Sequence, residues 1–175
     1  GRIGYQSFDL LGCLNALTQS IHLELNNDFI GVFLDVEQVD NYFLERNGLS
    51  PSGNLYKCQA PLKILGSPEE YTYVYEKENN PESDYSDLIN FIEWLNRSSL
   101  ENFAFEAGDR FAVDDFIDIH TVAIAVAHTD LTNDFYLYNN PADGRWHYAP
   151  RDLNECYSLD FAQAPINLSL IHISE

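Results

Sequence analysis

Methionine is absent from this sequence, and cysteine occurs only at Cys13, Cys58 and Cys156. These three cysteines are widely spaced and form no Cys-x-x-Cys pair, so neither a zinc site nor a disulfide framework is predicted. No apolar run approaches the roughly 20 residues that a membrane-spanning helix needs, and no basic and then apolar leader precedes Gly1. The sequence therefore predicts a soluble chain and leaves its compartment open.

Basic residues are also scarce. Nine Lys and Arg residues stand against 28 Asp and Glu residues, which gives a formal charge of −19 at pH 7. This charge repels phosphate backbones and anionic lipid headgroups, so we expect neither nucleic acid nor a membrane surface as a partner. The same charge attracts divalent cations wherever carboxylates converge. Because a single acid is usually a solvated surface group, only clustered acids are candidates for function.

Both ends of the chain have unusual sequences. The chain starts at Gly1 directly in an amphipathic segment, which predicts a fragment of a longer protein. Residues 168–175 resemble a translated sequencing-library adapter, so we expect them to lie outside the fold. The alternative for this tail is an ordinary apolar strand.

Turn residues and apolar spacing predict the elements of the first half. Gly12 ends a helical pattern, because glycine adopts the left-handed conformation without steric cost. Asn26, Asn27 and Asp28 tolerate the positive φ of a tight hairpin turn. The expected elements are a helix over 4–11, a hairpin of strands 22–25 and 29–37, a helix over 39–47, and strands over 54–59 and 71–75. The last of these strands lies in a long, partly ordered linker between lobes, over 59–80.

The second half contains two helical patterns and another hairpin. A helix is expected over 85–97, with Asp84 as its N-cap and an apolar stripe facing the core. A second helix begins near Val113, where two acids favour the positive end of the helix dipole. A hairpin is expected from strands 135–138 and 145–149, joined by a turn over 140–144.

This order of elements predicts an α+β fold rather than a parallel α/β sheet. Two lobes joined at a cleft fit it best. The partial N-lobe, with its hairpin and linker, is expected over 1–80, and the mainly helical C-lobe, with the second hairpin, over 81–167.

The second hairpin carries the residues that suggest chemistry. Asp130 lies in a loop between a helix and a strand, where a carboxylate can act as a general base. Asn133 and Asp134 follow at the start of the strand, and Asp152 comes just after the return strand, so hairpin geometry brings Asp134 and Asp152 toward one metal ion. Phosphoryl transfer from ATP requires this set of oxygen groups. The alternative from spacing alone is an ordinary amphipathic hairpin with surface acids.

Several sequence blocks resemble one protein family in the same order. Residues 26–40, with Gly31-Val-Phe-Leu34 and Glu37-Gln-Val-Asp40, resemble the family's first hairpin and its Glu-x-Val-Asp segment. Further blocks are Phe43-Leu-Glu-Arg-Asn-Gly48, Gly53-Asn-Leu-Tyr-Lys57, Asp84-Tyr-Ser-Asp-Leu88, Val113-Asp-Asp-Phe-Ile-Asp118, Tyr136-Leu-Tyr138 and Gly144-Arg-Trp146. On these blocks the chain resembles the CotH-type spore-coat kinases, atypical protein kinases with a two-lobed kinase-like fold.

The resemblance implies a role for each candidate residue. Asp130 stands at the position of the catalytic aspartate, and Asp134 and Asp152 stand at metal-binding positions, with Asn133 as the alternative to Asp134 because the loop is short. Glu37 would border the nucleotide pocket. Lys57, in the Gly-Asn-Leu-Tyr-Lys block, is a nucleotide-binding candidate, although a lysine at a strand end is more often a solvated charge.

The sequence also departs from the family pattern. Arg151 replaces a tryptophan, Asn154 replaces an aspartate, Asp134 replaces an asparagine, and His128-Thr-Asp130 replaces Asn-Trp-Asp. The family's upstream lysine, which contacts nucleotide phosphates, has no counterpart here, where Lys57, Lys63 and Lys77 are the only lysines. For His120, His128 and His147, which share no common spacing, packing or surface roles are favoured over metal ligation.

The resemblance implies ATP-dependent phosphorylation of Ser or Thr in protein substrates by the full-length parent, with Mg²⁺ or Mn²⁺ as the metal and a spore coat or cell surface as the location. By itself this chain is expected to be inactive. The main alternative is a non-catalytic coat or surface assembly protein that keeps the fold, and the departures at Arg151 and Asn154 favour it. A glycoside hydrolase that uses Asp130 and Asp152 is a third hypothesis, since two carboxylates flank the cleaved bond in such enzymes.

Overall fold

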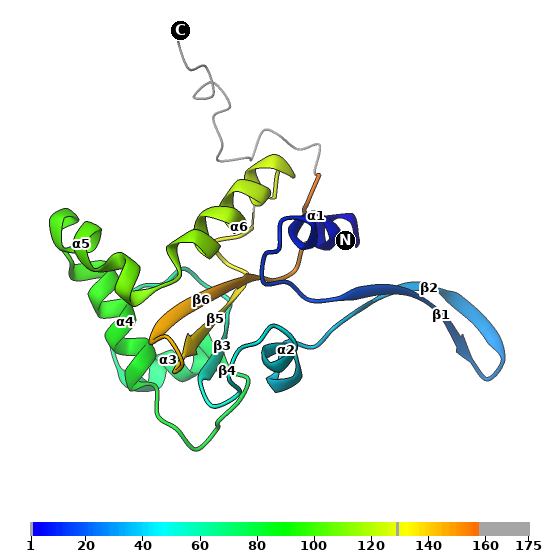
Figure 1. Ribbon diagram of the computed structural model, residues 1–175. Coiled ribbons are helices and arrows are strands. Elements are labelled where there is room, and N and C mark those ends of the chain that lie inside the picture. The colour runs from blue at the N-terminus through cyan, green and yellow to red at the C-terminus, as the bar shows by residue number, and fades with distance from the viewer. Residues whose placement is uncertain (1, 129, 158–175) are drawn as a thin grey trace, which may run out of the picture.

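A computed structural model describes residues 2–128 and 130–157. Figure 1 shows a body of helices and a small sheet, from which one hairpin projects. In chain order the elements are α1 (Arg2–Leu10), β1 (Thr18–Leu25), β2 (Asp28–Val36), α2 (Asn41–Arg46), β3 (Asn54–Cys58), α3 (Pro68–Val74), β4 (Tyr75–Lys77), α4 (Ser86–Arg97), α5 (Leu100–Arg110), α6 (Val113–Ala125), β5 (Phe135–Asn140) and β6 (Arg145–Pro150). The α+β class predicted from the sequence is confirmed.

The predicted first hairpin is confirmed as the antiparallel pair β1 and β2. Asn26 and Asn27 have φ of 54° and 70°, the left-handed values that a two-residue turn of this hand requires. The ribbon extends away from the body (Figure 1), and large apolar side chains on it stay exposed, with Leu25 at 63%, Phe29 at 61% and Val32 at 61%. Most of the hairpin therefore does not pack against the hydrophobic core.

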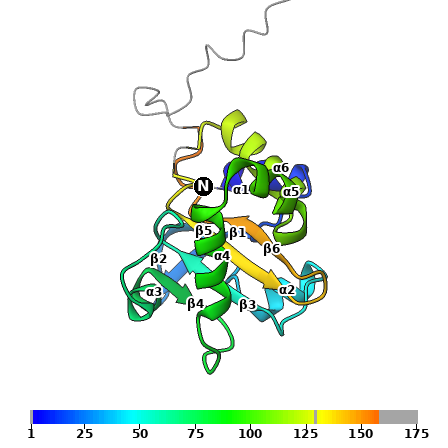
Figure 2. The same cartoon turned by 90° about the vertical axis from the view of Figure 1, so that its left-hand side faces the viewer.

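The second sheet has four strands in the order β4-β3-β5-β6, and its β5–β6 pair confirms the predicted second hairpin. Residues directly opposite each other in antiparallel strands share a face. Tyr56, Leu137 and Tyr148 are in register and buried on the face that α4 crosses (Figure 2). On this face the Phe91 ring of α4 stacks on the Trp146 ring of β6, with centroids 4.9 Å apart.

The opposite face carries polar groups. Lys57, Tyr136 and Ala149 are in register there, and α1, α2 and the projecting hairpin lie on this side of the sheet (Figure 1). The sheet combines strands from both sides of the predicted division at residues 80 and 81. The two-lobe division itself remains a prediction.

The strand predicted over residues 71–75 is wrong. Helix α3 occupies most of this segment, with Pro68 at its start and Glu69 and Glu70 in its first turn, and only Tyr75 enters a strand. Tyr71 and Tyr75 are buried while Tyr73 is 88% exposed. A spacing of four residues places two side chains on one side of a helix as well as of a strand, so tyrosine alternation did not decide between them.

The four predicted helices are present as α1, α2, α4 and α6, and besides α3 one further helix, α5, was not predicted. Helix α4 buries Leu88, Phe91 and Ile92, and α2 is capped by Asp40, whose side chain accepts from the backbone N–H of Tyr42 at 2.8 Å. The additional helix α5 begins after Ser99, whose hydroxyl accepts from the backbone N–H of Asn102 at 3.2 Å. Within the described residues, no helix has the length and apolar character needed to cross a bilayer.

Asp87 connects α4 to the sheet. One carboxylate oxygen accepts from the Tyr56 hydroxyl at 2.6 Å and from the backbone N–H of Leu88 at 2.8 Å. The other accepts from the side-chain amides of Asn54 at 2.9 Å and Asn139 at 3.1 Å. One half-buried carboxylate therefore satisfies donors from β3, β5 and the helix itself.

His147 joins β6 to α6 and to the β5–β6 turn. Its Nδ1 lies 2.8 Å from the Asp115 carboxylate and its Nε2 lies 2.9 Å from the Asp143 carboxylate. Although burial lowers the pKa of His147, the hydrogen bonds and charges of Asp115 and Asp143 outweigh it and raise this pKa above its usual value. The protonated imidazolium, which donates at both nitrogens, is the form that this site favours.

Replacing Asp87 should destabilise the fold strongly. We expect Asp87→Ala to lower the free energy of unfolding by about 3 kcal/mol or more, because several donors to a charged acceptor lose their partner at once. The matched control, Asp109→Ala on the exposed surface of α5, should change it by less than about 0.5 kcal/mol. Urea unfolding followed by tryptophan fluorescence measures both, and an equal effect for the two variants would contradict the structural role of Asp87.

The His147 contacts predict a pH-dependent contribution to stability. A folded-state pKa above the unfolded value near 6.5 gives stability that is fully present below pH 6.5 and is lost as pH rises through the folded pKa. His147→Gln should therefore lose most stability relative to the wild type near pH 5.5, and the difference should shrink toward alkaline pH. Urea unfolding across this range checks it, with His22→Gln on the exposed hairpin as the control. A difference that grows with pH would refute the interpretation.

Candidate active site

A single turn after α6 brings together three of the predicted site residues. The helix ends at Ala125, and Ala127 takes a φ of 50°, which redirects the chain. The Asp130 carbonyl accepts from the backbone N–H of Asn133 at 3.1 Å and of Asp134 at 3.2 Å. The Asn133 side-chain amide donates to the Asp130 carboxylate at 2.9 Å. This acid turn, residues 130–134, leads directly into β5.

The return strand places Arg151 and Asp152 beside the acid turn. Because Phe135 pairs with Pro150, the next residues outward, Asp134 and Arg151, also face each other. The Arg151 backbone N–H donates to the Asp134 carbonyl at 3.2 Å, and its guanidinium donates to the Asp134 carboxylate. Asp152 follows with a φ of 49° and is exposed. The structure thus places Asp134 and Asp152 near one another, with Arg151 bound to Asp134.

The carboxylates of this region influence each other. Burial raises the pKa of Asp134, as do a hydrogen bond with the Asp130 side chain and the negative charges of Asp130 and Asp152, while the Arg151 guanidinium opposes them. The net direction is upward. The Arg151 guanidinium therefore does not fully offset the combined effect of burial and of the neighbouring Asp130 and Asp152 side chains.

The chemical nature of these groups suits a divalent cation, but their placement does not. Carboxylates with an amide oxygen nearby are the ligands that Mg²⁺ and Mn²⁺ prefer. However, within residues 2–128 and 130–157, no three His, Cys, Asp or Glu side chains are grouped closely enough to hold a metal ion. At Asp134 the position of a counter-ion is taken by Arg151.

Lys57 lies on the same polar face of the sheet. Its ammonium forms ion pairs with Glu76 at 2.8 Å and with Glu78 at 4.0 Å, both from the β4 side. Tyr136 lies between Lys57 and the acid turn in the sheet register. Burial and the charge of Glu78 raise the pKa of Tyr136 to about 12, against the lowering effect of Arg151. The charge of Arg151 also lowers the pKa of Glu76 and opposes the raised pKa of Glu78, so Arg151 interacts with acids from the β4 side as well as with Asp134.

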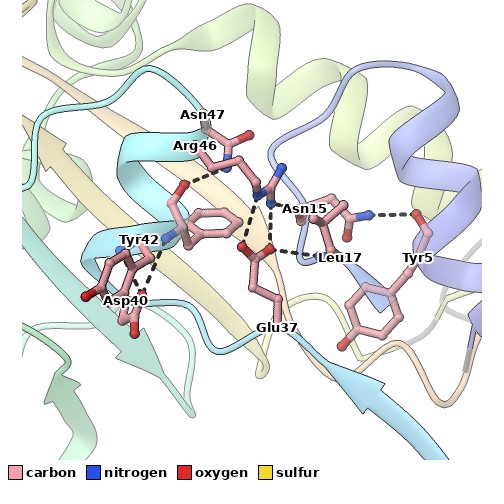
Figure 3. Close-up of polar contacts among 9 residues, drawn as sticks. Tyr5, Asn15, Leu17, Glu37, Asp40, Tyr42, Arg46 and Asn47 are labelled. Atoms are coloured by element: carbon pink, nitrogen blue, oxygen red, sulfur yellow. Dashed lines mark hydrogen bonds and ion pairs between the residues drawn. The ribbon is translucent and has the colours of Figure 1, made fainter. Parts of the chain in front are cut away.

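Glu37 has a different setting, at the base of the projecting hairpin. Its carboxylate accepts from Arg46 at 3.0 and 2.6 Å and from the backbone N–H of Leu17 at 2.9 Å (Figure 3). The Glu37 backbone N–H donates in turn to the Leu17 carbonyl at 2.8 Å. The ion pair of Glu37 with Arg46 anchors the hairpin to α2. Its predicted place beside a nucleotide remains a prediction.

Tyr5 of α1 links this anchor to the segment of Arg151 and Asp152. Arg46 donates to the Asn15 carbonyl at 2.9 Å, and the Asn15 amide donates to the Tyr5 carbonyl at 2.7 Å (Figure 3). Burial raises the pKa of the Tyr5 hydroxyl, the backbone of Leu153 lowers it, and the charge of Asp152 raises it. The side chain of Tyr5 is therefore close to the Asp152 segment while its carbonyl belongs to the hairpin anchor.

His128 lies two residues before Asp130 and is 4% exposed. Neither ring nitrogen has a hydrogen-bond partner among the described residues. Burial lowers the pKa of His128, although the charges of Asp130, Glu155 and Asp152 raise it, so the imidazole is held neutral. A neutral ring buried in this way has the packing role favoured from the sequence.

Sequence reasoning treated Arg151 as a departure and gave no role to Tyr5 or Tyr136. One signal could have identified the role of Arg151. Counting the hairpin register outward from its turn pairs residue 134 with residue 151. Both positions depart from the pattern that the sequence resembles, with a negative charge at Asp134 and a positive charge at Arg151. No sequence pattern indicated that α1 would approach Asp152.

Comparison with known proteins identifies the family. The family model described as "CotH kinase protein" matches residues 4–164. Among curated proteins, the inner spore coat protein H of Bacillus subtilis (strain 168) is 22% identical over 167 residues, which cover 91% of this chain and 46% of that protein. The chain thus spans about half the length of this relative. Because the family model covers most of the sequence, the chain belongs to the CotH family.

Proposed function

We propose that this chain carries the catalytic segment of a protein kinase that transfers the γ-phosphoryl group of ATP to Ser or Thr hydroxyls of protein substrates. The observation that carries the proposal is the acid turn, where Asp130, Asn133 and Asp134 lie together beside the strand end that bears Asp152. Membership of a family described as a kinase family supports it. A two-lobed kinase-like arrangement, of which these residues form part, belongs to the same proposal.

Asp130 would act as the general base. Its carboxylate accepts a hydrogen bond from the Asn133 amide at 2.9 Å, which fixes the orientation of the acid. In the reaction the acceptor oxygen forms a bond to the γ-phosphorus, the bond to the β–γ bridging oxygen breaks, ADP leaves, and the hydroxyl proton passes to Asp130. Catalysis of this kind depends on positioning and charge stabilisation rather than on covalent intermediates.

Asp134 and Asp152, with Asn133, are the groups that would hold Mg²⁺ or Mn²⁺. When bound, such an ion neutralises the negative charge of the nucleotide phosphates. Lys57 would contact the phosphates from the same face of the sheet, with its ammonium oriented by Glu76. Glu37 would border the nucleotide from the base of the hairpin, where Arg46 holds its carboxylate in place.

A second function is a non-catalytic protein of a spore coat or cell surface. The ion pair between Arg151 and Asp134 favours it, because one of the acids needed for a metal is already neutralised within the chain. The name of the Bacillus relative, inner spore coat protein H, supports a coat location under either function.

Phosphoryl transfer should depend on Asp130. In the complete reading frame, Asp130→Asn should lower the rate of label transfer from radiolabelled ATP by about 100-fold or more, because the base is lost while size and hydrogen bonding are kept. Asp109→Asn, an exposed acid on α5, is the matched control and should keep the wild-type rate.

The assay uses Mg²⁺ or Mn²⁺, with the protein itself and spore-coat proteins as acceptors. Thermal unfolding of each variant shows that the fold is kept. A wild type that transfers no label would refute the kinase proposal and leave the assembly function, and an Asp130→Asn variant with the wild-type rate would exclude Asp130 as the base.

A further inference from the structure

We infer that an aromatic cavity between α4, α5, the start of α6 and β6 is a binding site for a small uncharged compound with one aromatic ring, of which benzene is the simplest. The cavity has a volume of about 140 Å³. Its lining shares no residue with the acid turn, the Arg151–Asp152 segment, Glu37 or Lys57. The inference is therefore independent of the proposed phosphoryl transfer.

The cavity is lined by aromatic rings that contact one another. These rings belong to Phe91, Phe103, Phe111, Phe116, Trp146 and Tyr148. Phe91 stacks on Trp146 with ring centroids 4.9 Å apart, and it meets Phe111 edge-on at 6.5 Å. Phe116 meets Phe111 edge-on at 5.9 Å and Tyr148 edge-on at 5.7 Å. Aromatic rings favour stacked and edge-on contacts with further rings, so this lining suits an aromatic ligand.

The volume of the cavity matches a single ring. Protein interiors contain few voids larger than a water molecule, so a space of about 140 Å³ beside the core is large. An engineered apolar cavity of roughly 150 Å³, lined by leucine, isoleucine and phenylalanine, stays dry and binds benzene. The present cavity is close to that size and richer in aromatic rings. A ligand of one six-membered ring therefore fits it.

Water is a poor occupant because the lining is almost entirely apolar. Its side chains carry two polar atoms, the Tyr148 hydroxyl and the Trp146 indole nitrogen. The hydroxyl donates to the Leu131 carbonyl at 2.6 Å, and neither atom is among the buried side-chain polar atoms of residues 2–128 and 130–157 that lack a hydrogen-bond partner. A buried water needs two to four polar partners, and a polar ligand would lose its hydrogen bonds to solvent on entry. The lining therefore selects an apolar ligand.

The burial of the lining residues indicates how a ligand enters. The buried side chains form the floor of the cavity, at Phe91, Ala112, Leu137, Trp146 and Tyr148. The other lining side chains are at least partly exposed and form a rim, at Leu62, Leu95, Phe103, Phe111 and Phe116. The floor can therefore be reached by rotation of side chains at the rim, without opening of the sheet.

The first experiment titrates the wild-type 175-residue chain with benzene and with pyridine, and follows the NMR chemical shifts of the Trp146 ring protons. Benzene should bind with a dissociation constant on the order of 1 mM or lower. Pyridine has the same shape, but its nitrogen would be buried without a donor, so it should bind at least about ten-fold more weakly. A Trp146 ring that does not respond to benzene would overturn the inference, as would equal affinities for the two compounds.

A matched pair of variants locates the bound ligand. Ala112→Leu enlarges a side chain on the floor of the cavity, so it should lower the affinity for benzene at least about ten-fold and leave the midpoint of thermal unfolding unchanged or higher, because it fills an existing space. Ala104→Leu makes the same change on the exposed surface of α5 and should keep the wild-type affinity.

Equal affinities of the two variants would place benzene elsewhere, such as on the apolar projecting hairpin, and would refute the inference. If Ala112→Leu does not fold, nuclear Overhauser contacts between benzene and the Trp146 ring of the wild type decide the location. Their absence at saturating benzene would refute the cavity as the site.

Discussion

The pairing of Phe135 with Pro150 is the constraint on which the candidate site depends. It closes the β5–β6 ladder and places the two segments beyond it, the acid turn and the Arg151–Asp152 segment, side by side. A shift of one residue would move every side chain of β5 to the other face of the sheet and would bury Tyr136 in place of Leu137. The register is held from both sides, by the buried contact of Tyr148 with Phe135 and by the Asp87 network at the far end of the hairpin.

Much of this arrangement follows from the sequence. Asn26 and Asn27 predicted a hairpin because few other residues accept positive φ in succession, and both have it. Apolar residues three, four and seven positions after Leu88 predicted α4, which buries Leu88 and Phe91. The alternation of tyrosines and tryptophan in 135–149 predicted β5 and β6. Counting along that hairpin placed Asp134 and Asp152 near one another without coordinates.

Other features could not be predicted because their causes are not local. Tyr71 and Tyr75 satisfy a strand pattern and a helix pattern equally, and the exposure of Tyr73, which a strand would place on the same face as both, distinguishes α3. Helix α5 has a weak apolar stripe with a glycine in it, and it is fixed by contacts of Phe103 with Trp94 and Phe111. The ion-pair partner of a charged residue is also set by contacts distant in the sequence. Glu37 pairs with Arg46, Lys57 with Glu76, and Asp134 with Arg151.

The anchor at Glu37 has a mechanical consequence for the hairpin. A two-stranded ribbon is at best marginally stable in water by itself, and most of this one has no neighbouring layer. The hairpin must therefore be most ordered at the Glu37–Arg46 anchor and least ordered at the Asn26–Asn27 turn. Arg46 also donates to the carbonyl of Asn15, and the Asn15 amide donates to the carbonyl of Tyr5. A displacement of the hairpin would therefore be transmitted to α1, whose Tyr5 side chain lies close to the Asp152 segment.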